Sequence, residues 1–402
     1  MTHEHTAPTR TPAMTTAAHT VRSARRVLVG LSHSLHAEPE IAMREHKSAA
    51  KIAAVLDDAG FSVTREAGGL PTALVGTYGT GDLVVALCAE YDALPGIGHA
   101  CGHNVNGAAV VGAALGLAAV ADAVGITVKL VGTPAEEDIG GKVLLLDAGV
   151  FDDAAAALMV HAAPEDSVGA SSLAVGAWDV TYRGRPAHAA LAPWEGVNAL
   201  DAMTLAHTAV GLLRQQLRPG TLVHDIVLEA GRAVNVIPEL ARARYELRAR
   251  TAEDLAHARR RVRACLEAGA LATGAELDIA ARGLDFADLR QDPFLTAAYV
   301  RAARALGREP VPRQGEVMAS TDMGNVSHLV PALHPTIGYD TQGALHHTEP
   351  FARHGISPGA DRAVLDGAIA LAHTAVELAT DPVERHSFLA RVAERQAQAD
   401  PV

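Results

Sequence analysis

The chain has 402 residues, of which 49% are hydrophobic and 20% are charged. This length exceeds the roughly 250 to 300 residues at which a single core stops growing, so we expect two packed units. The composition is that of a folded globular protein and excludes a largely disordered chain. A formal net charge of -12 argues against nucleic acid and anionic membrane as partners, because both require clustered positive charge.

The three cysteines, Cys88, Cys101 and Cys265, are too few, and odd in number, for a disulfide framework. They indicate a reducing compartment, and we expect the cytoplasm. Residues 1–20 are rich in Thr, Ala and His without an apolar stretch, so we expect a disordered tail there rather than a signal peptide or an anchor. The most apolar run, Ala108 to Val124, is rich in small residues, which favours a buried helix over a membrane span.

The first half of the chain alternates helical and strand patterns. We expect helices at 20–36 and 44–59, followed by strands at 61–65, 73–78, 83–91, 126–133 and 155–161. The last three strands are continuous apolar runs separated by helical patterns. Such runs are typical of strands buried on both faces of a mostly parallel sheet.

The pattern changes between residues 171 and 285. The expected order is strand 173–183, helix 197–217, strand 222–230, strand 240–250, helix 252–270 and strand 276–282. This is the ferredoxin-like βαββαβ order, which can fold as an inserted domain. The flanking segments, 21–170 and 286–402, would then form one discontinuous domain, with helices at 293–307 and 359–380 and a strand at 334–339. The predicted fold class is α/β, with a mostly parallel central sheet flanked by helices.

Side chains able to bind a metal follow the predicted strands directly. They are Asp92, Cys101, His103, Glu136, Glu137, His161, His346 and His347. Ligand sites of open α/β sheets form at the carboxyl ends of the strands, so these distant residues are expected to converge there.

Each of these motifs also has a purely structural interpretation. Cys101 and His103, within GHACGHN, could be a buried cysteine and a helix-capping histidine. The carboxylates in GTPAEEDIGG could be an acidic helix N-terminus, His161 a satisfied core histidine, and the late histidine pair a solvated loop. The metal hypothesis rests on convergence, and five ligands of mixed sulfur, nitrogen and oxygen character suit two metals that share a bridging ligand and a water.

Seven segments together resemble a known family. They are LHAEPE (35–40), EYDALPGIGHACGHN (90–104), GTPAEEDIGGK (132–142), GRPAHAALAPWEGVNALDA (184–202), NVIPE (235–239), STDMGN (320–325) and HTEPF (347–351). The sequence resembles the cocatalytic metallopeptidases that include aminoacylases, carnosinases, glutamate carboxypeptidases and indoleacetyl-amino-acid hydrolases. Within this family it is most similar to the amidohydrolase branch of β-alanyl-lysine dipeptidase.

The resemblance implies a function and a set of site residues. Two divalent metals, zinc first and manganese or cobalt as alternatives, would be bound by Cys101, His103, Glu137, His161 and His347. Glu136 would be the general base in hydrolysis of a small amide or dipeptide. The inserted domain would act as a lid and homodimer interface, and its His188 and Asn235 would reach the substrate carbonyl. Arg248 would bind a substrate carboxylate. Asp322 would lie on the substrate side or behind the metal ligands.

The sequence departs from the family pattern at Glu90, where many relatives carry the histidine of a His-x-Asp motif. The first metal is therefore expected to rely on the Cys101 and His103 pair. Asn104 stands where this branch often has aspartate, which leaves the metal preference open. Two other functions remain: a cysteine hydrolase that uses Cys101 with His103 or His161, and a non-catalytic homologue that acts as a binder or scaffold.

Overall fold

A computed structural model of the protein describes residues 11–399. The chain divides into two compact units: the first is formed by the chain up to Ser171, by Leu289–Glu316 and by the chain from Asn325 onward, and the second by Ser172–Asp288 and Val317–Gly324. The second unit therefore includes a return segment that lies outside the predicted 171–285. This segment joins it because Leu173 N donates to Ala319 O at 3.2 Å and Ser320 Oγ donates to Leu173 O at 2.9 Å.

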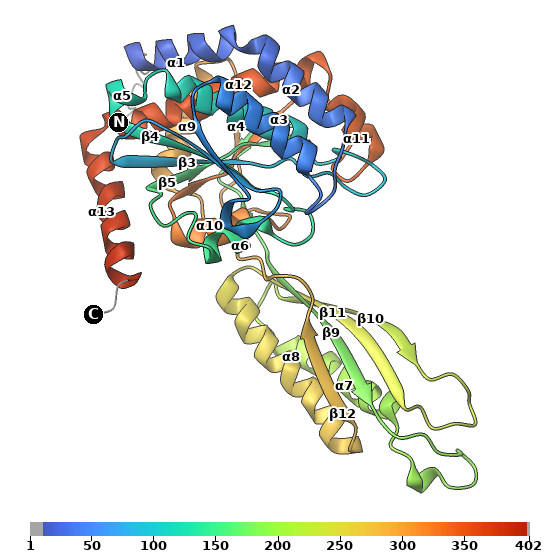
Figure 1. The fold of residues 1–402 in the computed structure, drawn as a ribbon. Helices are drawn as coiled ribbons and strands as arrows, with labels where there is room; N and C mark the ends of the chain where they lie inside the picture. Colours follow the sequence, from blue (N-terminus) through green and yellow to red (C-terminus); the bar gives the residue numbers. More distant parts are fainter. Residues whose placement is uncertain (1–10, 400–402) are drawn as a thin grey trace. The chain divides into compact units, whose positions relative to one another are not determined.

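The first unit holds most of the helices (Figure 1). Its helices are α1 Pro12–Ser23, α2 Arg25–Ala37, α3 His46–Asp58, α4 His103–Ala118, α5 Ala121–Val124, α6 Gly141–Asp147, α9 Pro293–Arg304, α11 Glu349–His354, α12 Pro358–Thr380 and α13 Pro382–Ala399, with the short η1 at Ala67–Gly69. Its strands are β1 Ser62–Arg65, β2 Leu74–Tyr78, β3 Leu83–Ala89, β4 Ile126–Gly132, β5 Ala156–Leu158, β6 His161–Ala163, β7 Ser167–Val168, β13 Val311–Pro312, β15 Ala332–Leu333 and β16 Thr336–Gly338. Three elements lie at the passages between the units: β8 Ser171–Ser172, β14 Val317–Met318 and α10 Met323–Leu329.

The main sheet of the first unit has the order β1-β2-β4-β3-β5-β15. The pairs β4 with β3, β3 with β5, and β5 with β15 are parallel, whereas β1 with β2 and β2 with β4 are antiparallel. The sheet is thus mostly parallel, and helix α4, buried along nearly its whole length, covers β3 and β4. This arrangement confirms the predicted α/β class, and it brings the carboxyl ends of β3, β4 and β5 to one sheet edge.

The predicted strand 155–161 is wrong as a single element. The structure has two short strands there, β5 in the main sheet and β6 in a second sheet of order β13-β7-β16-β6. The chain changes sheets because it pairs first with β15 and then, three residues later, with β16. As a result His161 begins a strand at the border between the two sheets.

The predicted disordered tail is also wrong over residues 11–20, while residues 1–10 lie outside the described part of the chain. Thr11 caps α1 by accepting a hydrogen bond from Met14 N at 3.2 Å. Met14, Ala17 and Val21 form a buried stripe of this helix, and α1 packs on α4 and α12. A stripe of mostly small residues is easily missed in a segment rich in Thr, Ala and His, but it buries well against another helix.

The second unit has the predicted βαββαβ order. Its elements are β9 Ala174–Arg183, α7 Ala199–Leu213, β10 Leu222–Ala230, β11 Leu240–Ala249, α8 Ala252–Thr273 and β12 Glu276–Ala281, with short turns η2 Pro193–Glu195 and η3 Arg214–Gln216. The strands form an antiparallel sheet of order β10-β11-β9-β12. Alternate residues of β9 and β11 are buried, and α7 and α8 pack against them to form a separate hydrophobic core.

Among the described residues, α12 is the helix long and apolar enough to cross a membrane. However, 83% of its most apolar window is buried inside the fold, as in the core helix of a globular unit. Most of its contacts are with α4, α9 and α1.

Candidate metal centre

The turn after β4 carries the adjacent carboxylates Glu136 and Glu137. Ala135 adopts a left-handed backbone with φ of 58°, and its amide donates to Glu45 Oε1 at 2.9 Å. The Glu137 amide donates to Asp92 Oδ2 at 3.0 Å. These hydrogen bonds fix a tight turn in which two neighbouring side chains can serve different purposes.

The turn that precedes α4 carries Cys101 and His103. Gly102 between them has φ of 75°, and a Cβ atom there would lie 2.5 Å from the Cβ of Ala162, so only glycine fits. His103 is the first residue of α4. Cys101 and His103 therefore enter the site from the turn and from the first turn of the helix, respectively.

Asp92 orients the ring of His103. The His103 Nδ1 atom lies 3.0 Å from both the backbone oxygen and Oδ1 of Asp92. A proton on Nδ1 satisfies these acceptors and leaves the lone pair of Nε2 available for a metal. Asp92 therefore lies behind His103, on the side of the ring away from Nε2.

The carboxylate of Glu137 spans two histidines. Its Oε1 lies 3.8 Å from His103 Nε2, and its Oε2 lies 3.6 Å from His347 Nε2. Ligand atoms of Cys101, Glu137 and His347 lie within 4.8 Å of one another, as do those of His103, Glu136 and Glu137. A carboxylate shared in this way suits a bridge between two cations.

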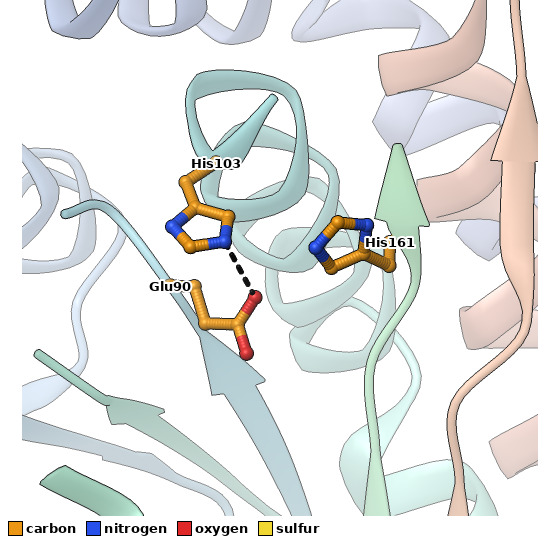
Figure 2. A group of neighbouring side chains, drawn as sticks. All are labelled: Glu90, His103 and His161. Atoms are coloured by element: carbon orange, nitrogen blue, oxygen red, sulfur yellow. Dashed lines mark ion pairs between the residues drawn. The ribbon is translucent and has the colours of Figure 1, made fainter. Parts of the chain in front are cut away.

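His161 lies beside His103, and the two rings are 5.5 Å apart at an interplanar angle of 86°. Ligand atoms of Glu90, His103 and His161 form a further group within 4.8 Å (Figure 2). The His161 Nδ1 lies 2.8 Å from the backbone oxygen of Ala162. When Nδ1 donates to that oxygen, Nε2 becomes the acceptor, as in His103.

The two late histidines have different surroundings. His347 faces Glu137. Its amide donates to Ala100 O at 3.0 Å, and this hydrogen bond joins the loop of His346 and His347 to the turn that carries Cys101. The ring of His346 instead lies with Nε2 2.8 Å from Ala162 O. This geometry favours His347 over His346 as a ligand.

Two buried atoms show that the site fits a cation. His103 Nε2 and Glu137 Oε1 are both buried and lack a hydrogen-bond partner, and they face each other. Buried polar groups are normally satisfied, so a proton on His103 or a metal cation must lie between these two atoms. Thiolate, imidazole and carboxylate are together a donor set for divalent transition metals.

The other predicted site residues lie in the second unit. His188 and Asn235 are exposed and lie on adjacent loops. The two loops are joined because Ala189 N donates to Asn235 O at 3.0 Å and His188 forms an isolated antiparallel β-bridge with Val236. Arg248 lies on β11, where its Nε donates to Glu246 Oε1 at 2.7 Å, and Asp322 is buried just before α10. Their roles toward a substrate stay predictions.

Residues 86–375 match the sequence profile of peptidase family M20/M25/M40. The chain belongs to this family. The Xaa-Arg dipeptidase of Mus musculus is 35% identical over 401 residues, which cover 94% of this chain and 93% of the mouse protein. A p-aminobenzoyl-glutamate hydrolase from Escherichia coli (strain K12) is 34% identical, over 63% of this chain and 57% of that protein.

Solved structures share the fold of this M20 chain. A protein of Bacillus subtilis described as a dinuclear metal-binding peptidase of the M20 family has a TM-score of 0.69 at 22% identity, over 89% of this chain and 99% of that one. An aminobenzoyl-glutamate utilization protein from Klebsiella pneumoniae has a TM-score of 0.67 at 19% identity, over 89% and 97% of the two chains. The predicted family resemblance is thus confirmed, and the chain is a hydrolase of the dipeptidase and amidohydrolase branch.

The electrostatics of this M20 site disfavour a cysteine nucleophile. Burial, together with the nearby carboxylates of Glu137 and Glu136, raises the pKa of the Cys101 thiol far above its usual range. A thiol activated for attack needs the opposite, a lowered pKa. Bound cations would reverse this balance, because a coordinating thiol loses its proton.

The histidines respond differently to burial. Burial alone would lower the pKa of His103, but the carboxylates of Asp92, Glu90 and Glu137 outweigh it and hold the pKa well above the usual value. The metal-free His103 is therefore protonated, and it would release its Nε2 proton on binding a metal. Burial lowers the pKa of His161 well below the usual value. His161 is therefore neutral, which is the form that binds metal.

The sequence interpretation missed two residues of the site. Glu90 was expected only as a departure from the family pattern, and Lys142 was not singled out. The structure places Lys142 Nζ 2.6 Å from Glu90 Oε1, with both side chains completely buried. A lysine in an otherwise apolar helical stretch, KVLLLD, was the available indication, because a buried lysine needs an acidic partner.

Proposed function

We propose that the protein is a dinuclear metal-dependent amidohydrolase that cleaves the amide bond of a small dipeptide, N-acyl amino acid or related amide. The observation that carries the proposal is the convergence of five predicted ligands, from four separate stretches of chain, around the buried atoms His103 Nε2 and Glu137 Oε1. The proposed ligands are Cys101, His103, Glu137, His161 and His347. Zinc suits the thiolate best, and manganese or cobalt would suit the oxygen and nitrogen donors.

Glu136 is the proposed general base. It is 8% exposed, and a carboxylate oxygen lies within 4.8 Å of ligand atoms of His103 and Glu137. When bound, divalent cations polarise a carbonyl and acidify water. Glu136 would accept the proton of the attacking water on its carboxylate and return it to the leaving amine, while Asp92 keeps the His103 ring oriented.

The substrate class follows from the relatives. The mouse relative, similar over almost the whole chain, is an Xaa-Arg dipeptidase, so dipeptides with a C-terminal arginine are the first substrates to assay. By the family resemblance His188 and Asn235 would contact the substrate carbonyl and Arg248 a substrate carboxylate, with Asp322 assisting on the substrate side. We propose the cytoplasm as the location, in keeping with three free cysteines.

A homodimer formed through the second unit is also proposed. Strand β10 is an edge of its sheet, and its apolar residues Leu222, Ile226 and Leu228 are 46%, 56% and 51% exposed. An exposed apolar edge strand is a template for pairing with another chain. Light scattering should give the mass of a dimer for the wild type and of a monomer for Ile226→Lys; a monomeric wild type would refute this part of the proposal.

The activity is tested with purified protein that has been stripped of metal and reloaded with zinc, manganese or cobalt. Hydrolysis of an Xaa-Arg dipeptide should be lost on stripping and return on reloading. Glu136→Gln should lower kcat by about 10² to 10⁴-fold. Equal activity of Glu136→Gln and the wild type would refute the base, and activity that survives complete stripping would refute the metal mechanism.

A further inference from the structure

Glu90 occupies a position that a purely structural ion pair does not explain. It directly follows β3, it is completely buried, and its Oε1 pairs with the equally buried Lys142. A buried ion pair on its own seldom stabilises a fold more than apolar residues of the same shape would. The second oxygen, Oε2, accepts a hydrogen bond from Asn106 Nδ2 at 3.1 Å and lies 3.5 Å from His103 Nε2.

The surroundings of Oε2 point to a cation. Figure 2 shows the Glu90 carboxyl group directed toward the space between the His103 and His161 rings. His103 Nδ1 is engaged by Asp92 and His161 Nδ1 lies against Ala162 O, so each ring has its Nε2 left for this side. A carboxylate oxygen and two imidazole nitrogens lie within 4.8 Å of one another. In the metal-free site a proton on His103 relieves their repulsion, and a divalent cation that replaces this proton would be held by all three groups.

We propose that Glu90 is itself a metal ligand, completing a three-residue half-site with His103 and His161. This inference rests on the proposed dinuclear function and adds a ligand to it. The other half-site consists of Cys101, Glu137 and His347, and Glu137 also reaches toward His103. Lys142 holds Oε1, so that Oε2 is the ligand oxygen, and it offsets part of the negative charge that three anionic ligands bring.

The two half-sites then differ in chemical character. The half-site of Glu90 offers one oxygen and two nitrogens, whereas the half-site of Cys101 offers sulfur, oxygen and nitrogen. Because thiolates select zinc and harder donors accept manganese or cobalt, the two positions should differ in metal preference. Exposed to zinc and manganese together, the protein should take up manganese mainly at the half-site of Glu90.

The test uses the full chain and the paired variant Glu90→Gln with Lys142→Met, which removes the carboxylate ligand without leaving an unpaired buried charge. The matched control is Asp153→Asn with Lys129→Met. It removes an ion pair in which Lys129 Nζ lies 2.6 Å from Asp153 Oδ1 and the Asp153 side chain is half exposed. Cobalt is titrated into stripped protein against a competing chelator. Stoichiometry is measured by elemental analysis, and the cobalt–thiolate absorption reports the half-site of Cys101.

The wild type and the control should bind two cobalt ions. The paired variant should bind one ion tightly with its thiolate absorption intact, and the second ion about 100-fold or more weakly. Circular dichroism checks that it is folded, and Glu90→Asp, which withdraws the carboxylate by one methylene, should give an intermediate loss of affinity. Two tightly bound ions in both Glu90 variants would overturn the inference alone, whereas a wild type that binds no pair of ions would overturn the proposed function as well.

Discussion

Replacement of Lys142 by methionine tests whether the buried ion pair is integral to the site. Lys142 Nζ lies 2.6 Å from Glu90 Oε1, and neither side chain is exposed. Methionine matches the length and volume of the lysine stem, so the main change is the loss of one charge. Removing one partner of a buried pair typically costs about 3 to 5 kcal/mol, because the other charge is left uncompensated in a poorly solvated place.

We therefore expect stripped Lys142→Met to lose about 3 to 5 kcal/mol of unfolding free energy at neutral pH, measured by urea denaturation. The control is Lys129→Met, which removes a lysine whose partner, Asp153, is 52% exposed. A pair with so exposed a carboxylate contributes about 1 kcal/mol or less. Adding Glu90→Gln to Lys142→Met should restore most of the lost stability, since the charge that Lys142 compensated is then removed as well.

The pH dependence has a definite sign. Burial raises the pKa of Glu90, but Lys142 and His103 outweigh it and hold the pKa below its usual range. Such a group stabilises the fold above the ordinary glutamate pKa, and this contribution is lost as the pH falls through the lowered value. Without Lys142 the carboxyl protonates at higher pH, so the deficit of the variant should shrink toward about pH 4. A loss equal to that of Lys129→Met, or a deficit that grows in acid, would refute the reasoning.

Three further predictions concern the frame of the site. Gly102→Ala should cost about 2 to 5 kcal/mol in unfolding free energy, from left-handed backbone strain plus overlap with Ala162. The control Gly96→Ala also has a positive φ but meets no neighbouring atoms, so it should cost only about 1 to 2 kcal/mol. Equal costs of the two variants would show that close packing at Gly102 is irrelevant. Removal of metal with a chelator should lower the unfolding free energy by about 3 to 4 kcal/mol relative to protein saturated at 100 to 1,000 times Kd, as followed by thermal unfolding; an unchanged Tm would contradict a built metal site. Burial raises the pKa of Glu45, so the neutral form supports the fold and its contribution is lost as the pH rises through the raised pKa. Glu45→Gln, which can still accept the hydrogen bond of Ala135 N, should therefore be more stable than the wild type near pH 8 and lose this advantage near pH 4. Urea denaturation at both pH values measures the difference, and a variant that is stabilised only near pH 4 would refute the prediction.

The location of the candidate site was predictable from strand order. Cys101, Glu137 and His161 each follow or border a buried strand, and parallel strands bring their carboxyl ends to one edge. The pattern of hydrophobic runs was sufficient for that inference, because burial on both faces is visible in the sequence. The βαββαβ order of the second unit was predictable from the same kind of pattern, because the spacing of its hydrophobic residues changes between that of a strand and that of a helix along the chain.

Other features depend on contacts that the sequence does not express. The break between β5 and β6 arises from a change of pairing partner, from β15 to β16, and the paired residues of both lie 175 positions later in the chain (Ala157 with Ala332, His161 with Thr336). The partnership of Glu90 with Lys142 likewise joins positions 52 residues apart, and neither residue carries a local pattern that predicts complete burial. The spacing of hydrophobic residues indicates which face of an element is buried, but it does not indicate which buried side chains contact one another.

Backbone strain provides an independent argument that the site is built for a ligand. Among the described residues, five non-glycine residues have left-handed φ, and two of them are Ala135, directly before the carboxylate pair, and His347, a candidate ligand. Each such residue costs about 1 to 2 kcal/mol and persists only where other interactions hold it. The bond of the Ala135 amide to buried Glu45, and the bond of the His347 amide to Ala100 O, provide those interactions. A site that served only to fill the sheet edge would gain nothing from such strain. The proposed site, in which Glu136, Glu137 and His347 would face the same ions, would require the side-chain directions that this backbone imposes.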